Sequence, residues 1–544
     1  MLNVSEFIIK TITGLGTNHL FGIPGKAIYP LILATDTMNA SFILTRHEAG
    51  AGFAATGYGL LNGKLGVALG TSGPGGTNML TAAGQANALS APVLFITGHP
   101  SAKNTGKPYA QDSSNFGTDL VPMFKPVTKF SASIYNLDQV PNFLYHAIHE
   151  ALTPPFGPVH LNIPCDILSE EIKDIPPFFL NIDTPTSSNI PLAINYLQDA
   201  KRPLLLAGKG IHSTKSYVEL EQFSERFNLP VATTPGGKGT FSSSHPLSLG
   251  AYGLGGNNLT QEYMESGIDI LVVIGTKLTD MSLPNLQPQY YPKQVIQLDW
   301  NPSIVGKSLP VPTLPIIGDI KQNLTTLLKQ APPKSTSTSS LSKKTSHPQI
   351  EDLNKWSASL AIKIIQESIE GDSVIFSDCG SHSYYAIENY LLKKPGTFFF
   401  DDVFAAMGNA LSFAIGAKLA APKKNIVCLT GDGCMMMHGM EIATAVNTGI
   451  DILIIIFNNE QLDMVDKAMY LGYGKAVGSK YEKGAHFAKL ANSLGALSSR
   501  CDSQADLKAA LNQFVQPMNC PRVIEVMVPK DEIQSSIKKR MEKL

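Results

Sequence analysis

The sequence predicts an α/β protein with three doubly wound domains, each built on a parallel sheet. Short apolar runs that end in glycine-rich turns alternate along the chain with segments of helical composition. This alternation is typical of parallel strands joined by crossover helices. A length of 544 residues suits about three domains of ordinary size. A stretch near residue 340, rich in Ser, Thr, Lys and Pro, predicts an exposed linker.

We expect the domains at residues 1–180, 185–330 and 350–535, with the linker at 332–348. Each domain contains apolar runs short enough to be buried strands. The predicted strands, some with the turn that follows, are 18–25, 42–44, 67–69, 92–97, 159–164, 202–210, 229–234, 269–275, 294–299, 373–378, 425–430 and 452–457.

Composition and charge narrow the class of protein. Hydrophobic residues make up 43% of the chain and charged residues 16%, which is ample for large buried cores. A formal net charge of −1 gives no basis for a nucleic acid or an anionic membrane as partner. The six cysteines lack Cys-x-x-Cys spacing, and no apolar segment suits a signal peptide or a membrane span. We therefore expect a cytoplasmic protein with reduced thiols.

The strongest motif is Gly431-Asp432-Gly433-Cys434, which directly follows the apolar run 425–430. A second apolar run, 452–457, leads to Asn458-Asn459. Ligands of open α/β sheets collect at the carboxyl ends of such strands. Asp432 and Asn459 could share a hard divalent cation there, and the glycines would let the backbone approach a diphosphate. A lone Gly-Asp-Gly turn often only begins a helix, but the two flanking strands favour a cofactor site.

This unit resembles the cofactor motif of the thiamine diphosphate-dependent enzymes, and the likeness to acetolactate synthase (acetohydroxyacid synthase large subunit) and its relatives runs from about Asn3 to Val528. The resemblance implies that Asp432 and Asn459 hold the Mg²⁺ that anchors the diphosphate. It implies a backbone carbonyl ligand at Gln461, and Cys434 and Met464 beside the cofactor. The domains would be, in order, pyrimidine-binding, middle and diphosphate-binding.

Glu48 is the main candidate for proton transfer. It stands between a predicted strand and a run of small residues in RHEAGAGFAATGYG, with TSGPGGTN following at Thr71. A surface charge or a helix-capping group is the usual role of such a residue, but these neighbours favour burial, and a buried carboxyl can exchange a proton near neutrality. The resemblance implies that Glu48 hydrogen-bonds N1′ of the aminopyrimidine and so assists removal of the C2 proton of the thiazolium.

Further positions in the first domain follow from the same resemblance. Pro24 and Gly25 are expected at the cofactor, and Lys26 follows them where a second glycine is usual. Lys26 could point to solvent or could supply a cation or a proton donor to an anionic substrate. Gln111, followed by Asp112, resembles a Gln-Glu pair near the reacting centre. A plain surface loop is an equal alternative, because Phe116 competes for the same place.

Two segments of the third domain complete the predicted cofactor site. Ser381 and His382 match positions that meet the diphosphate, although a lone histidine beside a turn is more often structural. Ala405 and Met407 match a segment in which a large apolar side chain wedges between the two cofactor rings. Methionine suits that place because it is apolar and flexible, and a core methionine is the alternative.

The resemblance also implies partners and further cofactors. Glu48 and Asp432 belong to different domains, and in the family the two ends meet across a subunit interface. We therefore expect a homodimer or a dimer of dimers (homotetramer), with the run of small residues after Glu48 as a closely packed interface helix. Acetohydroxyacid synthases carry flavin in the middle domain, whereas relatives leave it empty or bind a nucleotide. FAD is an option here that we do not favour, because a Gly-x-Gly turn alone cannot decide it.

The function implied is thiamine diphosphate- and magnesium-dependent decarboxylation of pyruvate or a related 2-oxo acid by a transferase or lyase. The retained fragment would pass to an acceptor carbonyl (carboligase) or to a proton. The alternatives are a simple decarboxylase, a C–C lyase and a non-catalytic cofactor-binding homologue. The intact Glu48, Asp432 and Asn459 argue against the last of these.

Three positions depart from the branched-chain biosynthetic synthases. Met281 replaces an arginine associated with the acceptor's carboxylate, and methionine offers no charge in its place. Ala468 stands where a tryptophan favours 2-oxobutyrate over pyruvate, and Lys26 replaces a glycine. Together they predict a different acceptor, such as an aldehyde or a larger carbonyl compound.

Overall fold

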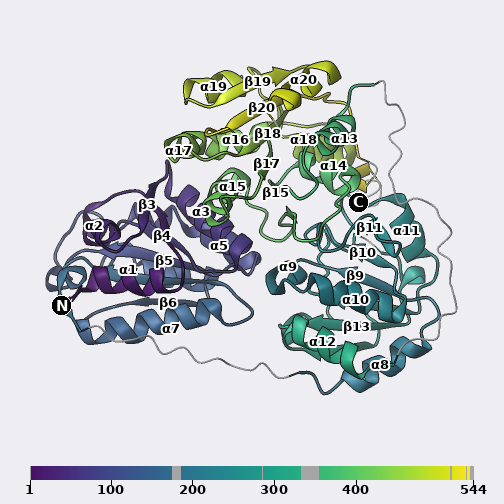
Figure 1. The fold of residues 1–544 in the computed structure, drawn as a ribbon, viewed down its shortest axis with the longest axis horizontal. Coiled ribbons are helices and arrows are strands. Elements are labelled where there is room, and N and C mark those ends of the chain that lie inside the picture. The colour runs from purple at the N-terminus through teal and green to yellow at the C-terminus, as the bar shows by residue number, and fades with distance from the viewer. Residues whose placement is uncertain are drawn as a thin grey trace.

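The computed structural model describes residues 2–173, 186–284, 286–332, 355–514, 518–534 and 536–538. In these residues the chain forms three six-stranded parallel sheets with helices on their faces, so the predicted α/β class is confirmed. The N-terminal unit lies at the left of Figure 1, the middle unit at the lower right and the C-terminal unit at the top. The predicted linker, apart from Pro332, and the predicted end of the first domain lie outside the described residues.

The N-terminal sheet has the strand order β3-β2-β4-β5-β7-β6. Its central strands β4, β5 and β7 are buried along their whole length, which explains why apolar residues predominate in them. The strands are β2 (His19–Gly22), β3 (Ser41–Leu44), β4 (Gly66–Gly70), β5 (Val93–His99), β6 (Phe130–Ser133) and β7 (Pro158–Pro164). A separate antiparallel pair joins β1 (Leu2–Asn3) to β8 (Glu171–Ile172).

The C-terminal sheet repeats the topology of the N-terminal one. Its order, β16-β15-β17-β18-β20-β19, places the strands in the same relative sequence as in the first sheet. The strands are β15 (Val374–Ser377), β16 (Phe398–Phe399), β17 (Ile426–Gly431), β18 (Leu453–Asn458), β19 (Leu497–Cys501) and β20 (Arg522–Met527). The strand order reverses between β15 and β17, and the loops that follow these two strands form one edge of the sheet.

The middle sheet has a different order, β11-β10-β9-β12-β13-β14, which is that of a dinucleotide-binding α/β fold. Its reversal point lies between β9 and β12, whose carboxyl ends face the N-terminal unit across a cavity described below. The strands are β9 (Leu204–Ala207), β10 (Val231–Thr233), β11 (Ser248–Ala251), β12 (Ile270–Ile274), β13 (Gln294–Asp299) and β14 (Thr313–Ile317).

The helices that concern the site lie in all three units. They are α3 (Glu48–Asn62), α5 (Leu80–Ala88), α9 (Gly210–Thr214), α13 (Ala358–Ser368), α14 (Ser381–Asn389), α15 (Asn409–Ala420), α16 (Asp432–His438), α17 (Ile442–Asn447) and α18 (Asp463–Tyr473). The remaining long helices are α1 (Val4–Gly14), α2 (Tyr29–Thr37), α7 (Val140–Leu152), α8 (Ile190–Asp199), α10 (Tyr217–Phe227), α11 (Asn258–Glu265), α12 (Ile320–Gln330), α19 (Phe487–Ser493) and α20 (Gln504–Phe514). No helix among these residues is long and apolar enough to cross a membrane.

Helix α3 joins the N-terminal and C-terminal units by packing closely on α15 (Figure 1). A side chain added at Gly57 would overlap the backbone of Phe413, and one added at Gly416 would overlap the backbone of Ala54. Buried apolar residues form one continuous cluster through both units at this contact. The run of small residues was expected at a subunit interface, but the contact that needs these glycines lies inside one chain.

Candidate active site

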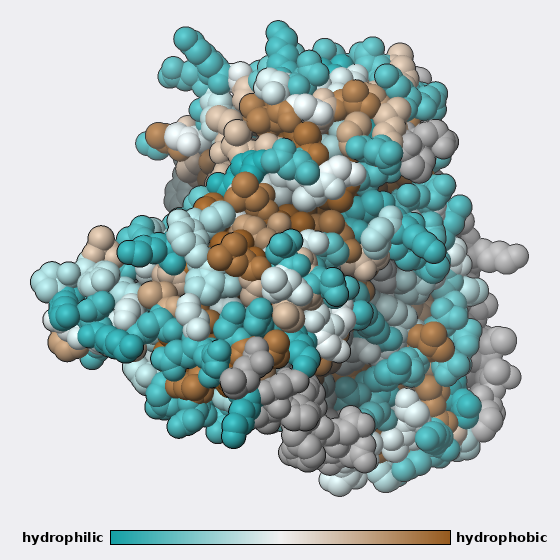
Figure 2. Space-filling view, turned by 60° about the vertical axis from the view of Figure 1, so that its left-hand side comes forward, coloured by the Kyte–Doolittle hydropathy of each residue, from teal (hydrophilic) through white to brown (hydrophobic). Residues whose placement is uncertain are grey.

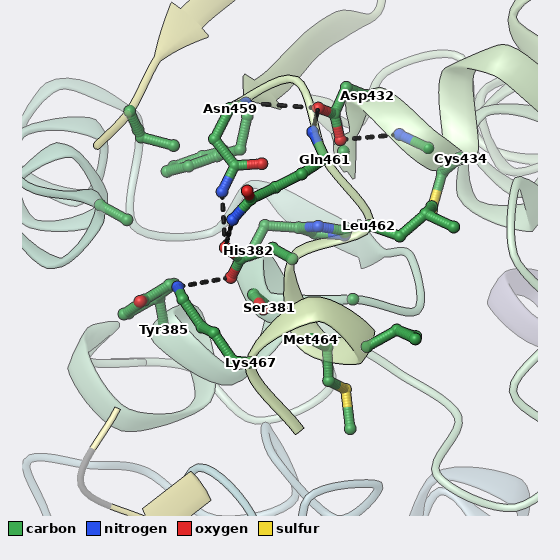
Figure 3. A pocket seen from close by; sticks show the side chains of 18 of the residues that line it. Ser381, His382, Tyr385, Asp432, Cys434, Asn459, Gln461, Leu462, Met464 and Lys467 are labelled. Atoms are coloured by element: carbon green, nitrogen blue, oxygen red, sulfur yellow. Dashed lines mark hydrogen bonds and ion pairs between the residues drawn. The ribbon is translucent and has the colours of Figure 1, made fainter. Parts of the chain in front are cut away.

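A pocket of about 160 Å³ opens at the carboxyl edge of the C-terminal sheet (Figure 3). The loops after β15, β17 and β18 supply most of its walls, and α14 and α18 begin beside it. All the described residues that line it belong to the C-terminal unit; they include Cys379, Ser381, His382, Met407, Gly431, Asp432, Gly433, Cys434, Asn459, Gln461, Asp463, Met464 and Lys467. Most of the predicted cofactor residues of this unit therefore meet in one place.

Asp432 lies at the end of β17 and is 6% exposed. Its Oδ1 accepts a hydrogen bond from Gly433 N at 2.8 Å, and its Oδ2 accepts from Gln461 N at 3.1 Å and Asn459 N at 3.3 Å. Burial raises the pKa of this carboxyl to about 6, although the backbone donors oppose the shift. A cation bound here would therefore stabilise the ionised form.

Asn459 and Gln461 lie beside Asp432 on the loop after β18. The Asn459 Nδ2 donates to Asp463 Oδ1 at 2.7 Å, and the Gln461 Nε2 donates to the same oxygen at 2.8 Å. The Asn459 amide oxygen points the other way, into the pocket (Figure 3). A carboxylate and an amide oxygen are the hard ligands that Mg²⁺ takes in proteins, so this arrangement fits a divalent cation.

The turn after β15 holds two buried polar atoms with no hydrogen-bond partner among the described residues, Ser381 Oγ and His382 Nε2. Burial lowers the pKa of His382 to about 4, so its ring is neutral near pH 7. A side chain at Gly431 would lie 2.8 Å from the His382 ring, which explains why this turn needs glycine. Such unpaired groups are costly unless a ligand meets them. A diphosphate oxygen would accept from the Ser381 hydroxyl, and from His382 Nε2 in the tautomer that carries the single ring proton on that nitrogen.

Cys434 and Met464 line the same pocket but differ in their surroundings. The Cys434 thiol is buried and donates to the Cys379 carbonyl at 3.2 Å. Met464 extends from the first turn of α18 and is partly buried (Figure 3). Burial raises the pKa of the Cys434 thiol, so this residue is a neutral wall of the pocket and no nucleophile.

Met407 reaches the pocket from a loop that all three units hold in place. Asp401 accepts hydrogen bonds from the backbone N–H of Phe404 at 2.9 Å and of Ala405 at 3.0 Å. Gln85 of the N-terminal unit donates to Asp401 at 2.8 Å, and Lys209 of the middle unit forms an ion pair with it at 2.5 Å. Burial alone would raise the pKa of Asp401, but the Lys209 ammonium and these donors hold it below its ordinary value.

The conformation of this loop is unusual at Ala405, whose φ is +56°, a value that L residues seldom adopt. The hydrogen bonds to Asp401 on one side and from Gly408 N to Asp378 on the other, at 2.8 Å, offset that strain. Asp378, which no sequence pattern singled out, is thus part of the support for Met407.

The predicted residues of the N-terminal unit lie at the carboxyl edge of their own sheet, away from this pocket. Glu48 is the first residue of α3 and is half-buried in a single chain, not buried as expected. The Asn78 Nδ2 donates to Glu48 Oε2 at 2.9 Å. Glu441 of the C-terminal unit fixes the approach to Glu48, because its buried carboxylate accepts from Arg46 N and His47 N, each at 3.0 Å.

The remaining predictions in this unit fall on turns that are exposed or partly exposed. Gly25 is only partly exposed, and a side chain there would overlap Thr71, so the turn after β2 requires glycine at this place. Pro24 and Lys26 are exposed, and Lys26 lies near Cys165. Gln111 is exposed with φ +57° and packs its backbone beside Gly73. No N-terminal residue lines the pocket, within the part of the chain that the structure describes.

Several residues of the site were not predicted from the sequence. Asp463 and Lys467 form an ion pair of 2.7 Å inside the pocket, although charges four apart on a helix usually mark a solvated face. Asn78 stands in the glycine-rich turn motif, and its place in that motif was the available signal. No local pattern marks Glu441, because its partners lie about 395 residues away in the sequence.

A second cavity, of about 500 Å³, lies at the reversal point of the middle sheet. Residues of all three units line it, including Lys129, Lys209, Lys277, Trp300 and Phe404. Open α/β sheets bind ligands at such points, so the cavity is where a flavin or nucleotide would lie. Our preference against FAD stays a prediction, which the visible absorption spectrum of the purified protein tests.

Sequence models of three thiamine pyrophosphate (thiamine diphosphate) enzyme domains match the chain. They are the N-terminal TPP binding domain at residues 2–118, the central domain at 190–327 and the C-terminal TPP binding domain at 378–526. The chain therefore belongs to the thiamine pyrophosphate enzymes, as its sequence motifs predicted.

Its relatives within this family include acetolactate synthases. The chain is 32% identical to a probable acetolactate synthase large subunit of Methanococcus aeolicus, over 95% of this chain and 90% of that protein. It is 30% identical to the acetolactate synthase large subunit of Lactococcus lactis, over 97% and 93%. A solved structure described as a thiamin diphosphate-dependent enzyme of Mycobacterium smegmatis has the same fold, with a TM-score of 0.83 at 19% identity, over 97% of this chain and all of that one.

Proposed function

We propose that this protein is a thiamine diphosphate- and magnesium-dependent enzyme that decarboxylates pyruvate or a related 2-oxo acid and joins the retained fragment to an acceptor carbonyl. The observation that carries the proposal is the buried Asp432 carboxylate, which shares a pocket with the Asn459 amide and with polar atoms of Ser381 and His382 that have no partner among the described residues. When bound, the cofactor supplies the carbanion chemistry of such reactions, and the protein supplies binding, orientation and proton transfer.

The residues have distinct roles in this proposal. Asp432, the Asn459 side chain and the Gln461 backbone carbonyl hold the cation. Ser381 and His382 meet the diphosphate, with Gly431 and Gly433 leaving room for it. Ala405 and Met407 support the organic rings, and the firm anchoring of their loop at Asp401 supports that role. Cys434 and Met464 form the remaining wall.

Glu48 has the proton-transfer role. Its carboxylate already accepts a hydrogen bond from Asn78, which leaves the other oxygen to meet a ring nitrogen. Pro24 and Gly25 border the same sheet edge, with Lys26 and Gln111 toward the substrate. Because no described residue of the N-terminal unit lines the pocket, the proposal requires a second copy to bring Glu48 to Asp432. The assembly is then a homodimer or a dimer of dimers with sites between subunits.

Exposed apolar side chains support such an assembly. Met436, Met437 and Met440, which lie shortly after Asp432 in the chain, are each more than half exposed. Figure 2 shows hydrophobic residues gathered on one face near the junction of the N-terminal and C-terminal units. Large exposed apolar patches commonly mark protein–protein contacts, and these lie beside the motif that the second copy must reach.

The acceptor, in this proposal, is an aldehyde or a larger carbonyl compound and not 2-oxobutyrate. Met281 packs against an apolar cluster of the C-terminal unit and offers no guanidinium to a carboxylate. Ala468 is half-buried on α18 and leaves the space that a tryptophan would fill. Lys26 is exposed in the single chain and is free to turn toward an anionic substrate in the assembly.

The test combines pyruvate, thiamine diphosphate and Mg²⁺ with the purified protein, and mass spectrometry identifies the products. Aldehydes, pyruvate and 2-oxobutyrate are offered in turn as acceptors, with the Asp432→Ala variant as the matched control. We expect a ligation product that needs the parent protein and favours an aldehyde. A preference for 2-oxobutyrate contradicts the proposed acceptor, and carbon dioxide without ligation indicates a simple decarboxylase. A parent protein that does not bind the cofactor in the presence of Mg²⁺ overturns the proposal as a whole.

A further inference from the structure

Asp463, the first residue of α18, gathers three side chains of the pocket around one carboxylate. Its Oδ1 accepts from Asn459 Nδ2 at 2.7 Å and from Gln461 Nε2 at 2.8 Å, and its Oδ2 accepts from Lys467 Nζ at 2.7 Å. The side chains of Asp463 and Lys467 are only 10% and 6% exposed. The dashed lines that meet below Asn459 and Gln461 in Figure 3 mark these contacts.

The chemistry of Asp463 decides which way the Asn459 amide faces. An amide presents an oxygen on one side and an NH₂ group on the other, and only the oxygen can bind a metal ion. An ionised carboxylate only accepts hydrogen bonds, so Asp463 holds the NH₂ group and turns the oxygen away from itself. That oxygen points into the pocket, which Asp432 also enters (Figure 3).

We propose that Asp463 is a positioning residue that presents the Asn459 oxygen to the divalent cation, with Lys467 balancing the charge of Asp463. The inference rests on the proposed function, because it needs a cation at Asp432 and Asn459. Groups that orient a metal ligand from behind commonly change metal affinity by about 10- to 100-fold when they are removed.

Lys467 is anchored in a way that suits this balancing role. Its Nζ also donates to the backbone carbonyl of Glu532, which accepts a second hydrogen bond from the Tyr385 hydroxyl at 2.8 Å. A second carboxylate this close to a diphosphate would repel it, and the fixed ammonium cancels that charge. The pair thus orients Asn459 without adding net charge to the pocket.

Asp466, in the same first turn of α18, shows what an ordinary acidic residue does at this helix end. Its carboxylate accepts from Ser479 Oγ at 2.6 Å, and it makes no hydrogen bond to Asn459 or Gln461 within the described part of the chain. Asp463 and Asp466 therefore share the helix dipole and a buried position but differ in contact with Asn459. This difference makes Asp466 a matched control.

The experiment titrates Mg²⁺ into full-length protein at a fixed thiamine diphosphate concentration and measures cofactor binding by calorimetry. The proteins are the parent, Asp463→Ala, Asp463→Asn and Asp466→Ala, each first compared by thermal unfolding without metal or cofactor. We expect the apparent Mg²⁺ dissociation constant of Asp463→Ala to rise about 10- to 100-fold. Asp463→Asn keeps an acceptor oxygen and should recover part of that loss, and Asp466→Ala should stay within about twofold of the parent.

The outcomes separate the inference from the proposed function. If the parent binds the cofactor with Mg²⁺ and Asp463→Ala binds equally well or more tightly, the positioning role is overturned while the proposed function stands. An equal loss in Asp466→Ala would also overturn it, because that loss would belong to the helix end and not to Asn459. Should Asp463→Ala not fold, a parent-like constant in Asp463→Asn together with a parent-like pH profile of binding would count against the role. If the parent shows no Mg²⁺-dependent binding, the proposed function fails and the inference falls with it.

Discussion

The two ends of the proposed site differ in how completely a single chain builds them. At the C-terminal end, Asp432 is buried and accepts hydrogen bonds from three backbone N–H groups. The neighbouring Asn459 side chain is held by its hydrogen bond to Asp463. At the N-terminal end, Glu48 is half-buried and Asn78 is its one side-chain partner among the described residues. The proposed metal-binding end is thus preorganised within one chain, whereas the proposed proton-transfer end, at Glu48, has fewer partners among the described residues.

This difference has a physical cause in the two motifs. The ligands of a cation must be arranged before it binds, and the carboxyl ends of β15, β17 and β18 bring them together within one sheet. In the proposed function Glu48 meets a ring nitrogen of the cofactor, and no described residue of the N-terminal unit lines the pocket at Asp432. The proposed function therefore needs a second copy to bring the edge of its N-terminal sheet to the pocket of the first.

The largest effect is expected from Asp432→Ala, which breaks the preorganised end. It removes the carboxylate of the proposed coordination set, so Mg²⁺-dependent binding of thiamine diphosphate should weaken by at least about a hundredfold. Calorimetric titration measures this, with Asp502→Ala as the control because Asp502 is an exposed carboxylate of the same unit. Cofactor affinity equal to the parent would mean that the motif has been misread.

Glu48→Gln sharpens the comparison from the other end. The amide cannot accept and return a proton as the carboxylate does, so exchange of the cofactor's C2 proton should slow by about a hundredfold. Cofactor affinity should stay close to that of the parent, because Glu48 makes no contact with the cation. Quenched-flow NMR of the C2 proton measures the rate, and Glu170→Gln, an exposed glutamate of the same unit, is the control. Full activity in Glu48→Gln would remove the assigned role.

Lys209→Met tests whether the ion pair between Lys209 and Asp401 helps to hold the loop that carries Met407 in place. The change leaves the buried Asp401 carboxylate without its ammonium, which typically costs about 3–5 kcal/mol when a buried pair is broken. We expect a lower unfolding temperature and slower turnover, since the loop at Ala405 loses part of its anchor. Lys321→Met, which breaks a pair between the exposed Lys321 and the partly exposed Glu219, should cost less than about 1 kcal/mol. Equal effects of the two changes would show that Asp401 does not support the loop.

A smaller effect is expected on the stability of the protein at low pH, and it originates at a buried histidine away from the pocket. His160 is buried in the N-terminal core, where the Thr97 and Ser131 hydroxyls meet its two ring nitrogens at 2.7 and 2.8 Å, and burial lowers its pKa to about 3. The folded-state pKa lies below the ordinary 6.5, so the unfolded chain binds more protons between these values. This contribution to stability is fully present above pH 6.5 and is lost as the pH falls toward 3.

His160→Gln, which keeps polar atoms for both hydroxyls, should therefore show a shallower fall of the apparent unfolding temperature between pH 7 and about 5. The measurement is a series of thermal unfolding curves of parent and variant across that range. An unchanged slope in the variant would place the acid sensitivity elsewhere, for example at the similarly buried His382 of the pocket.

The sequence predicted those parts of the fold whose apolar runs are continuous. Strands β4, β5, β17 and β18 were found because their residues are buried on both faces. The buried strand β20 was missed because Arg522 and Glu525 interrupt its pattern. Tertiary partners pair both charges: Asp451 forms an ion pair with Arg522, and Asn458 donates to Glu525 at 2.7 Å. The edge strands β6, β11 and β19 were missed because their partly exposed residues have mixed polarity. The edge strands β14 and β16 were missed although they are mostly apolar; β14 contains a proline and β16 has only two residues.

The residues of the candidate site likewise divide into those that the sequence could predict and those that it could not. Asp432 and Asn459 could be predicted because each follows an apolar strand directly, so local pattern and site geometry coincide. Asp463 and Lys467 could not, because an acid and a base four residues apart on a helix are common at exposed surfaces. Their burial depends on the C-terminal segment at Glu532, which meets them only in the folded chain. Glu48 was expected to be buried but is half-buried in the single chain. Its burial depends on what covers the carboxyl edge of its sheet, which the local sequence does not determine.

The central claim, that one site takes Glu48 from one copy and Asp432 from another, is tested by mixing inactive variants. Glu48→Gln and Asp432→Ala are co-expressed with different tags, and the hybrid dimer is purified through both tags. If the site lies between subunits, one of the two sites in the hybrid keeps both native residues, so about half of the parent activity per dimer should return. If each chain builds its own site, both sites of the hybrid carry a defect, and activity no higher than that of the single variants would contradict the account.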